Sequence, residues 1–188
     1  MFPITSNIRT KLREGIEQEL TNPFLAEYVN MVDKALSPTG LPMKEATEVI
    51  DSVLDNPNLS IAVKTYLAYN GRYVRRASTW CFEHLEGNSL YDFYMGHLEP
   101  SESLIISFAS NENLNWDTVV AALTPLEREA AELFFEHLNN KTFKEFSILL
   151  FKDRRFLQVP LPTVANKARK VYDIDNSVPD EWIEKMFV

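Results

Sequence analysis

The chain contains one cysteine and only five glycines in 188 residues. The single cysteine, Cys81, excludes an internal disulfide and any zinc site built from two or more thiolates. We therefore expect an intracellular, cytoplasmic protein, because a reducing compartment imposes no need for disulfides. The scarcity of glycine leaves few residues for positive-φ turns or phosphate-cradling loops, which favours helices over β-hairpins and nucleotide-binding loops.

Long apolar runs are also absent. None approaches the roughly 20 residues that a transmembrane helix requires, and residues 1–15 lack the apolar core of a signal peptide. We expect no membrane partner. Acidic residues outnumber basic ones by 27 to 19, and the formal net charge of −8 argues against blanket binding to nucleic acid or to an anionic membrane.

The motifs of the common enzyme classes are missing. The sequence contains no G-x-S-x-G, no Walker loop and no G-x-G-x-x-G. Its three histidines, His84, His97 and His137, are dispersed and form no metal-binding pattern. The acidic segment 173–184 places oxygen-bearing residues at several EF-hand positions, but Val178 stands where the sharp turn of that loop needs glycine. We predict a protein without enzymatic activity, cofactor or metal site.

Apolar residues recur at helical spacing through nearly the whole chain. Ile8, Leu12 and Ile16, for example, form one stripe. The stretch "LIISFAS", from residue 104, is compatible with a short buried helix or with a strand. The pattern predicts an all-α fold of about nine or ten helices. Several helix starts are expected to combine a capping side chain with a proline or an acidic residue: Asn22-Pro23, Asn115, Thr124–Glu127, and Thr142 with Glu145.

The length of the chain suits one compact multi-helix domain or two small packed lobes. Pro100 to Ser103 is the best candidate boundary, because it separates the predicted helices into two groups. We therefore expect an N-terminal helical lobe over residues 1–99. A C-terminal lobe over 100–188 would contain a basic segment and an acidic tail.

Positive charge is concentrated near the carboxyl end. Residues 141–172 contain eight Lys or Arg but only two carboxylates, Glu145 and Asp153. A helix over 163–172 would bury its valines and present its cations outward, an arrangement that suits phosphates or an acidic protein surface. We predict that this surface binds a macromolecular partner through Lys152, Arg154, Arg155, Lys167, Arg169 and Lys170.

A second basic patch lies in the N-terminal half. Residues 56–82 contain no acidic side chain and interleave arginines with aromatic residues. Such a mixture can stack on and neutralise a single nucleic-acid strand, and it is equally typical of protein–protein hot spots. The alternative is that the aromatic side chains are core and the arginines are rim. The candidate binding residues of this patch are Arg72, Tyr73, Arg75 and Arg76.

The order of predicted helices over residues 123–172 resembles that of the C-terminal promoter-reading domain of sigma factors. "LTPLEREAAELFF" is similar to its opening helix, "TFKEFSILLF" to its supporting helix and "PTVANKARKVY" to its recognition helix. The resemblance implies DNA binding by the last of these. The chain departs from the pattern because a helix-turn-helix joins its last two helices by about three or four residues, whereas residues 152–162 intervene here.

Three interpretations of the basic segments remain open. The cations pair with acidic residues of the same chain, or bind a protein partner in an adaptor, assembly or regulatory role. Alternatively, segments 141–172 and 64–76 bind nucleic acid. The sequence is also compatible with a homo-oligomer. Small size, acidity and the lack of enzyme motifs resemble those of accessory proteins from large DNA phages. We predict protein binding first and nucleic-acid binding as the alternative.

Overall fold

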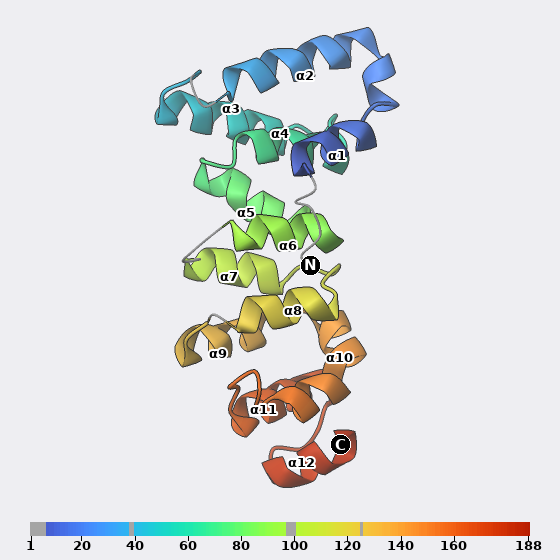
Figure 1. Cartoon of the computed structure of the whole chain (residues 1–188), viewed down its shortest axis with the longest axis vertical. Coiled ribbons are helices and arrows are strands. Elements are labelled where there is room, and N and C mark those ends of the chain that lie inside the picture. The colour runs from blue at the N-terminus through green and yellow to red at the C-terminus, as the bar shows by residue number, and fades with distance from the viewer. Residues whose placement is uncertain (1–6, 38–39, 97–100, 125) are drawn as a thin grey trace. The chain divides into compact units, whose positions relative to one another are not determined.

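The computed structural model describes residues 7–37, 40–96, 101–124 and 126–188, and it is helical (Figure 1). These residues form twelve α-helices and one short 3-10 helix, without any strand, so the predicted all-α class is confirmed. The helices are more numerous than the nine or ten that were expected. The chain divides into two compact units, Met1–Gly96 and His97–Val188. Pro100, in the predicted boundary, lies outside the described residues.

The first unit is organised around one helix that is buried on most of its surface. This helix, α4 (Ile61–Asn70), contacts four neighbours. Val63, Leu67 and Ala68 are buried, and so is the amide side chain of Asn70. A helix that is covered nearly all round marks the centre of a helical unit. The other elements are α1 (Ile8–Gly15), the 3-10 helix η1 (Glu19–Thr21), α2 (Pro23–Ala35), α3 (Met43–Asp55), α5 (Arg75–His84) and α6 (Gly87–Met95).

The second unit contains six helices packed around phenylalanine side chains. The stretch "LIISFAS" is helical, within α7, which settles the choice that the pattern left open. Phe108 on α7 packs against Phe134 on α9, with ring centroids 6.0 Å apart, and Phe151 on α10 stacks on Phe187 of α12 at 4.8 Å. The elements are α7 (Glu102–Ala109), α8 (Trp116–Leu123), α9 (Arg128–His137), α10 (Asn140–Asp153), α11 (Leu161–Tyr172) and α12 (Asp180–Phe187).

Two of the predicted helix caps are confirmed. Asn22 accepts a hydrogen bond from the Phe24 amide at 3.0 Å, and Asn115 accepts one from the Thr118 amide at 2.8 Å. Each satisfies an amide that the first turn of a helix leaves without a partner. Pro23 occupies the first turn of α2, where its missing N–H costs nothing.

The two predicted capping boxes are wrong. Thr124 ends α8, and α9 starts only at Arg128. Thr142 lies inside α10, and its amide donates to the true cap, Asn139, at 2.9 Å. Asn139, and not Thr142, is the N-cap because its backbone amide also donates a hydrogen bond to the Ala109 carbonyl oxygen at 3.0 Å. This bond ties the start of α10 to the end of α7. Such a tertiary tie is invisible to a local capping pattern.

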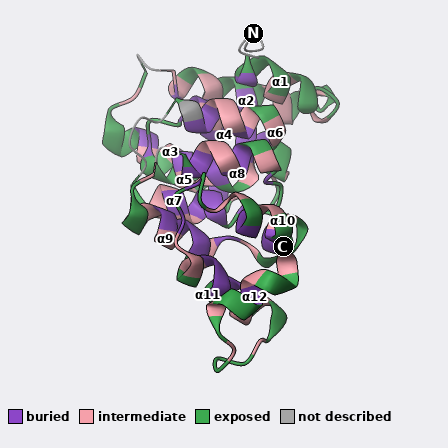
Figure 2. Cartoon of the chain, turned by 60° about the horizontal axis from the view of Figure 1, so that its bottom comes forward, coloured by how far each residue is buried: buried purple, intermediate pink, exposed green. Residues whose placement is uncertain are grey.

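Buried and exposed residues alternate along the helices of both units, as Figure 2 shows. Most helices bury one stripe and leave the opposite face to solvent, as amphipathic helices do, whereas α4 is covered nearly all round. Within the residues that the structure describes, no helix combines the length and the apolar character needed to cross a bilayer.

Candidate functional site

The outward face of α10 carries a row of cations. Phe143 and Leu150 point into the core of the second unit. Residues spaced three or four apart share a helix face, so the opposite face presents Lys141, Lys144, Ile148 and Lys152, all of them exposed. Arg155 follows three residues later, in the turns after α10, and is exposed too. We call these five residues, Lys141, Lys144, Ile148, Lys152 and Arg155, the α10 ridge.

The four cations of the α10 ridge make few contacts with the described parts of the chain. None of the four forms an ion pair with a carboxylate in the described parts of the chain. Lys141 makes only a long contact, 3.5 Å from its Nζ to the Glu112 carbonyl oxygen. At a rise of 1.5 Å per residue, the row extends about 16 Å from Lys141 to Lys152. Glu145, at its edge, is the one exposed carboxylate of α10.

Apolar side chains accompany these cations. Ile148 lies at the middle of the ridge and is 60% exposed, and Phe156, next to Arg155, is 74% exposed. Large apolar residues exposed within a charged row suit a partner that offers both acidic and apolar groups. The α10 ridge therefore combines charge with apolar contact area.

The prediction that Lys167 projects into solvent is wrong. The residue is only 7% exposed, and its Nζ lies 3.3 Å from the Glu136 carbonyl oxygen in the last turn of α9. Burial lowers the pKa of Lys167, and the nearby charge of Lys170 lowers it further, against an opposing effect of Glu136. The helix turns this lysine inward because α9 packs against that face of α11. Lys167 caps a helix end, as lysines often do.

The same prediction is wrong for Arg154 and Arg169, because α12 covers both. Arg154 Nε donates to Glu184 Oε1 at 2.8 Å, and its side chain is 14% exposed. Arg169 Nη2 contacts Asp180 Oδ1 at 2.6 Å and also the Val178 carbonyl oxygen, with its side chain 12% exposed. These two arginines fasten α12 to α10 and α11, which is the intrachain pairing that the sequence left open.

Three of the six residues predicted in segment 141–172 do face solvent. Lys152 and Arg155 belong to the α10 ridge, and Lys170 is exposed on α11. Sequence reasoning missed Lys141 and Lys144 as site residues. The signal was present: residues 141, 144, 148, 152 and 155 recur at helical spacing, on the side opposite Phe143 and Leu150.

The second predicted patch is partly used within the first unit. Arg76 forms ion pairs with Asp51, at 2.7 Å, and with Asp55. Its pKa is raised by the hydrogen bonds to Asp55 and Asp51. The guanidinium carbon of Arg72 lies over the Tyr69 ring, 4.5 Å from its centroid. Tyr73 and Arg75 are exposed. Arg72, Tyr73 and Arg75 thus remain accessible, whereas Arg76 is held by two carboxylates.

One described histidine, His84, is engaged by the neighbouring Trp80. His84 stacks on Trp80, with ring centroids 3.8 Å apart, and its Nδ1 lies 2.9 Å from the Trp80 carbonyl oxygen. His97 lies outside the described residues. In the parts of the chain that the structure describes, no group of three or more His, Cys, Asp or Glu is arranged to hold a metal ion.

The segment that resembles a sigma-factor helix-turn-helix has a different geometry from that motif. The supporting helix, α10, ends at Asp153, and the next helix, α11, begins only at Leu161. Two cations of the would-be recognition helix, Lys167 and Arg169, are turned into the protein. A DNA-reading helix needs such residues on its free face.

Comparison with known proteins adds no relative. No protein-family model matches the chain, and neither a curated protein nor a solved structure matches it.

Proposed function

We propose that this chain is a non-enzymatic helical protein that binds an acidic protein partner through the α10 ridge. The observation that carries the proposal is the row of four exposed cations around Ile148, none of which pairs with a carboxylate of the described residues. In the same basic segment, Arg154 and Arg169 form ion pairs with carboxylates of their own chain. The ridge cations are exposed and therefore accessible to a second molecule.

The charge balance of the chain favours a protein partner over a polyanion. At physiological ionic strength the Debye length is about 8 Å, so a partner in contact with the ridge feels the local cations more than the remote net charge of −8. A long nucleic acid would extend beyond the row and meet the acidic remainder of the surface. Ile148 and Phe156 offer apolar contacts that a phosphate backbone does not use but a protein face does.

An adaptor, assembly or regulatory role is the form of function that suits this surface, and a phage accessory protein is one setting for it. We place the function inside the cell, as the single cysteine suggests. The absence of familiar enzyme motifs and the structural surroundings of His84 support a non-enzymatic role.

Capture from the native cell extract tests the proposal. Lys144 and Lys152 are replaced together by Glu, and a matched control replaces Lys11 and Lys44, two exposed lysines of the first unit, by Glu. Both variants change the net charge equally. We expect the ridge variant to lose a partner, with at least about tenfold weaker binding to it in purified form, while the control retains it. Equal retention by both variants, or equal loss, would remove the α10 ridge from the proposal.

Nucleic-acid binding is the second candidate. Phe156 is an exposed aromatic residue beside the cationic Arg155, and such a pair can stack on an unpaired base. Treatment of the extract with nuclease separates the two candidates. A complex that survives nuclease supports a protein partner. A complex that is lost after nuclease treatment supports nucleic acid. In that case the affinity measured without nuclease should fall about tenfold or more between 50 and 200 mM salt.

A further inference from the structure

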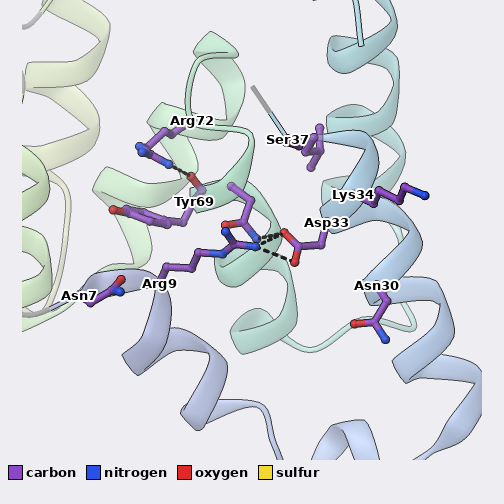
Figure 3. A pocket seen from close by; sticks show the side chains of 10 residues that line it. Asn7, Arg9, Asn30, Asp33, Lys34, Ser37, Tyr69 and Arg72 are labelled. Atoms are coloured by element: carbon purple, nitrogen blue, oxygen red, sulfur yellow. Dashed lines mark hydrogen bonds and ion pairs between the residues drawn. The ribbon is translucent and has the colours of Figure 1, made fainter. Parts of the chain in front are cut away.

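The first unit contains a polar pocket of about 510 Å³ between α1, α2 and the end of α4 (Figure 3). Its charged lining residues are Arg9, Lys34 and Arg72 against one carboxylate, Asp33. The volume lies within the range of about 300–1,000 Å³ that is typical of small-molecule sites. An excess of cations around a pocket of an acidic protein points to an anionic ligand.

Asp33 is saturated by hydrogen bonds from its own protein. Both of its oxygens accept from Arg9 Nη2, at 2.8 and 2.9 Å. The Tyr66 hydroxyl donates to Oδ2 at 3.0 Å and the Asn70 amide donates to Oδ1 at 2.8 Å. A carboxylate has about four acceptor positions, so Asp33 has none left for a ligand. Its charge is compensated, and its structural effect is to hold Arg9 across the pocket, as Figure 3 shows.

Arg9 and Arg72 both retain donors for a ligand. Arg9 directs Nη2 to both oxygens of Asp33, and a side-chain hydrogen bond with Tyr66 and the charge of Asp33 raise its pKa. A guanidinium group has five N–H donors, so these two partners do not use all of them. Arg72 uses Nη1 for the Tyr69 carbonyl oxygen at 2.9 Å, and its guanidinium carbon lies 4.5 Å from the Tyr69 ring centroid, so two contacts hold the group. Two guanidinium groups held in place before a ligand arrives lose little conformational entropy on binding.

We propose that this pocket binds a small phosphate-bearing molecule, with Arg9 and Arg72 as its charged contacts. A planar carboxylate is satisfied by one guanidinium fork. Two arginines on separate elements suit an anion with more oxygens and more charge, which a phosphate provides. Asn30 and Ser37 line the same pocket and add neutral hydrogen-bonding groups. Lys34 points away from the Arg9–Asp33 pair in Figure 3 and is not assigned a contact. The site is in the first unit and does not depend on the α10 ridge.

Titration of the full chain with inorganic phosphate, followed by the amide NMR signals of residues 69–72, tests the site. Ionic strength is held constant with chloride. We expect saturable shifts with a dissociation constant in the millimolar range, and acetate should bind about tenfold more weakly. A linear response to phosphate, or equal affinity for acetate and phosphate, would overturn the proposal.

Two arginine variants locate the binding. Arg72→Gln removes a pocket guanidinium, while Arg75→Gln removes one three residues away that does not line the pocket. Both side chains are exposed, so both variants are expected to fold, which circular dichroism checks. We expect Arg72→Gln to weaken phosphate binding at least about tenfold and Arg75→Gln to leave it unchanged. Equal effects of the two variants would contradict the assignment.

Discussion

Arg154 and Glu184 are thirty residues apart and lie in contact, with Arg154 Nε 2.8 Å from Glu184 Oε1. This ion pair joins the end of α10 to α12. The next residue, Arg155, is exposed and pairs with no carboxylate among the described residues. Two adjacent arginines of one basic segment therefore have different functions: one stabilises the second unit and the other belongs to the α10 ridge.

This difference is directly measurable. We expect Arg154→Ala to lower the free energy of unfolding by about 1–3 kcal/mol, because it leaves Glu184 without its partner in a partly buried position. Arg155→Ala should change it by less than about 0.5 kcal/mol. Urea unfolding followed by circular dichroism measures both. Similar losses for the two variants would show that the Arg154–Glu184 contact does not stabilise the fold.

Lys167 makes the stability depend on pH. Its pKa is lowered in the folded protein, chiefly by burial. Between the folded and unfolded pKa the unfolded chain binds more protons, so the contribution of Lys167 to stability rises as pH increases toward about 10.5. Lys167→Met should remove this contribution. The stability of the variant relative to the wild type should therefore fall as pH rises from about 7 to about 10. The control is Lys44→Met, at an exposed position of the first unit, for which the difference should stay flat.

The Cys81 thiol should be unreactive in the native state. The side chain is buried, and burial raises its pKa well above the ordinary value of a thiol. A thiolate is the reactive form, so a thiol reagent at pH 8–9 should label the folded protein far more slowly than the unfolded one, which offers one thiol per chain. The pKa of Cys81 is higher in the folded chain than in the unfolded chain. The free energy of unfolding should therefore decrease as pH rises above about 8.5, because the unfolded chain loses the thiol proton first. Rapid stoichiometric labelling of the native protein would contradict the buried position.

Asn139 should contribute more to the stability of the fold than an ordinary surface asparagine does. It caps α10 through the Thr142 amide and also donates its side-chain amide to the Asn111 carbonyl oxygen. We expect Asn139→Ala to destabilise the protein by about 1–2 kcal/mol. Asn140→Ala, one residue on and exposed, should be close to neutral. Thermal unfolding compares the two, and an equal effect would show that the cap is not stabilising.

Gly71 allows α4 to end against the side chain of Ile50. A Cβ at this position would lie 2.5 Å from Ile50 Cδ1, and Ile50 is fully buried. We expect Gly71→Ala to cost about 1–3 kcal/mol through overpacking. Ile50→Val removes the methyl group that the new Cβ would meet. Gly71→Ala should therefore cost less stability when it is added to Ile50→Val than when it is made in the wild type. An equal cost in both backgrounds would mean that the clash is relieved elsewhere.

Part of the molecule follows from the order of the residues alone. Helical spacing of apolar side chains and the scarcity of glycine determine an all-α fold, and local chemistry determines the caps at Asn22 and Asn115, since each cap contacts an amide two or three residues away. The concentration of cations in residues 141–172 is likewise a property of the sequence.

Which cations face solvent is decided by the tertiary structure. Periodicity tells which residues share a helix face, but not which face a helix from elsewhere in the chain will cover. Packing of α9 and α12 against α10 and α11 buried Lys167 and engaged Arg154 and Arg169, because their partners come from α9 and from residues 178–184. It left the α10 ridge uncovered. The pocket of the first unit is likewise tertiary, since Arg9, Asp33 and Asn70 come from three helices whose meeting no local pattern encodes.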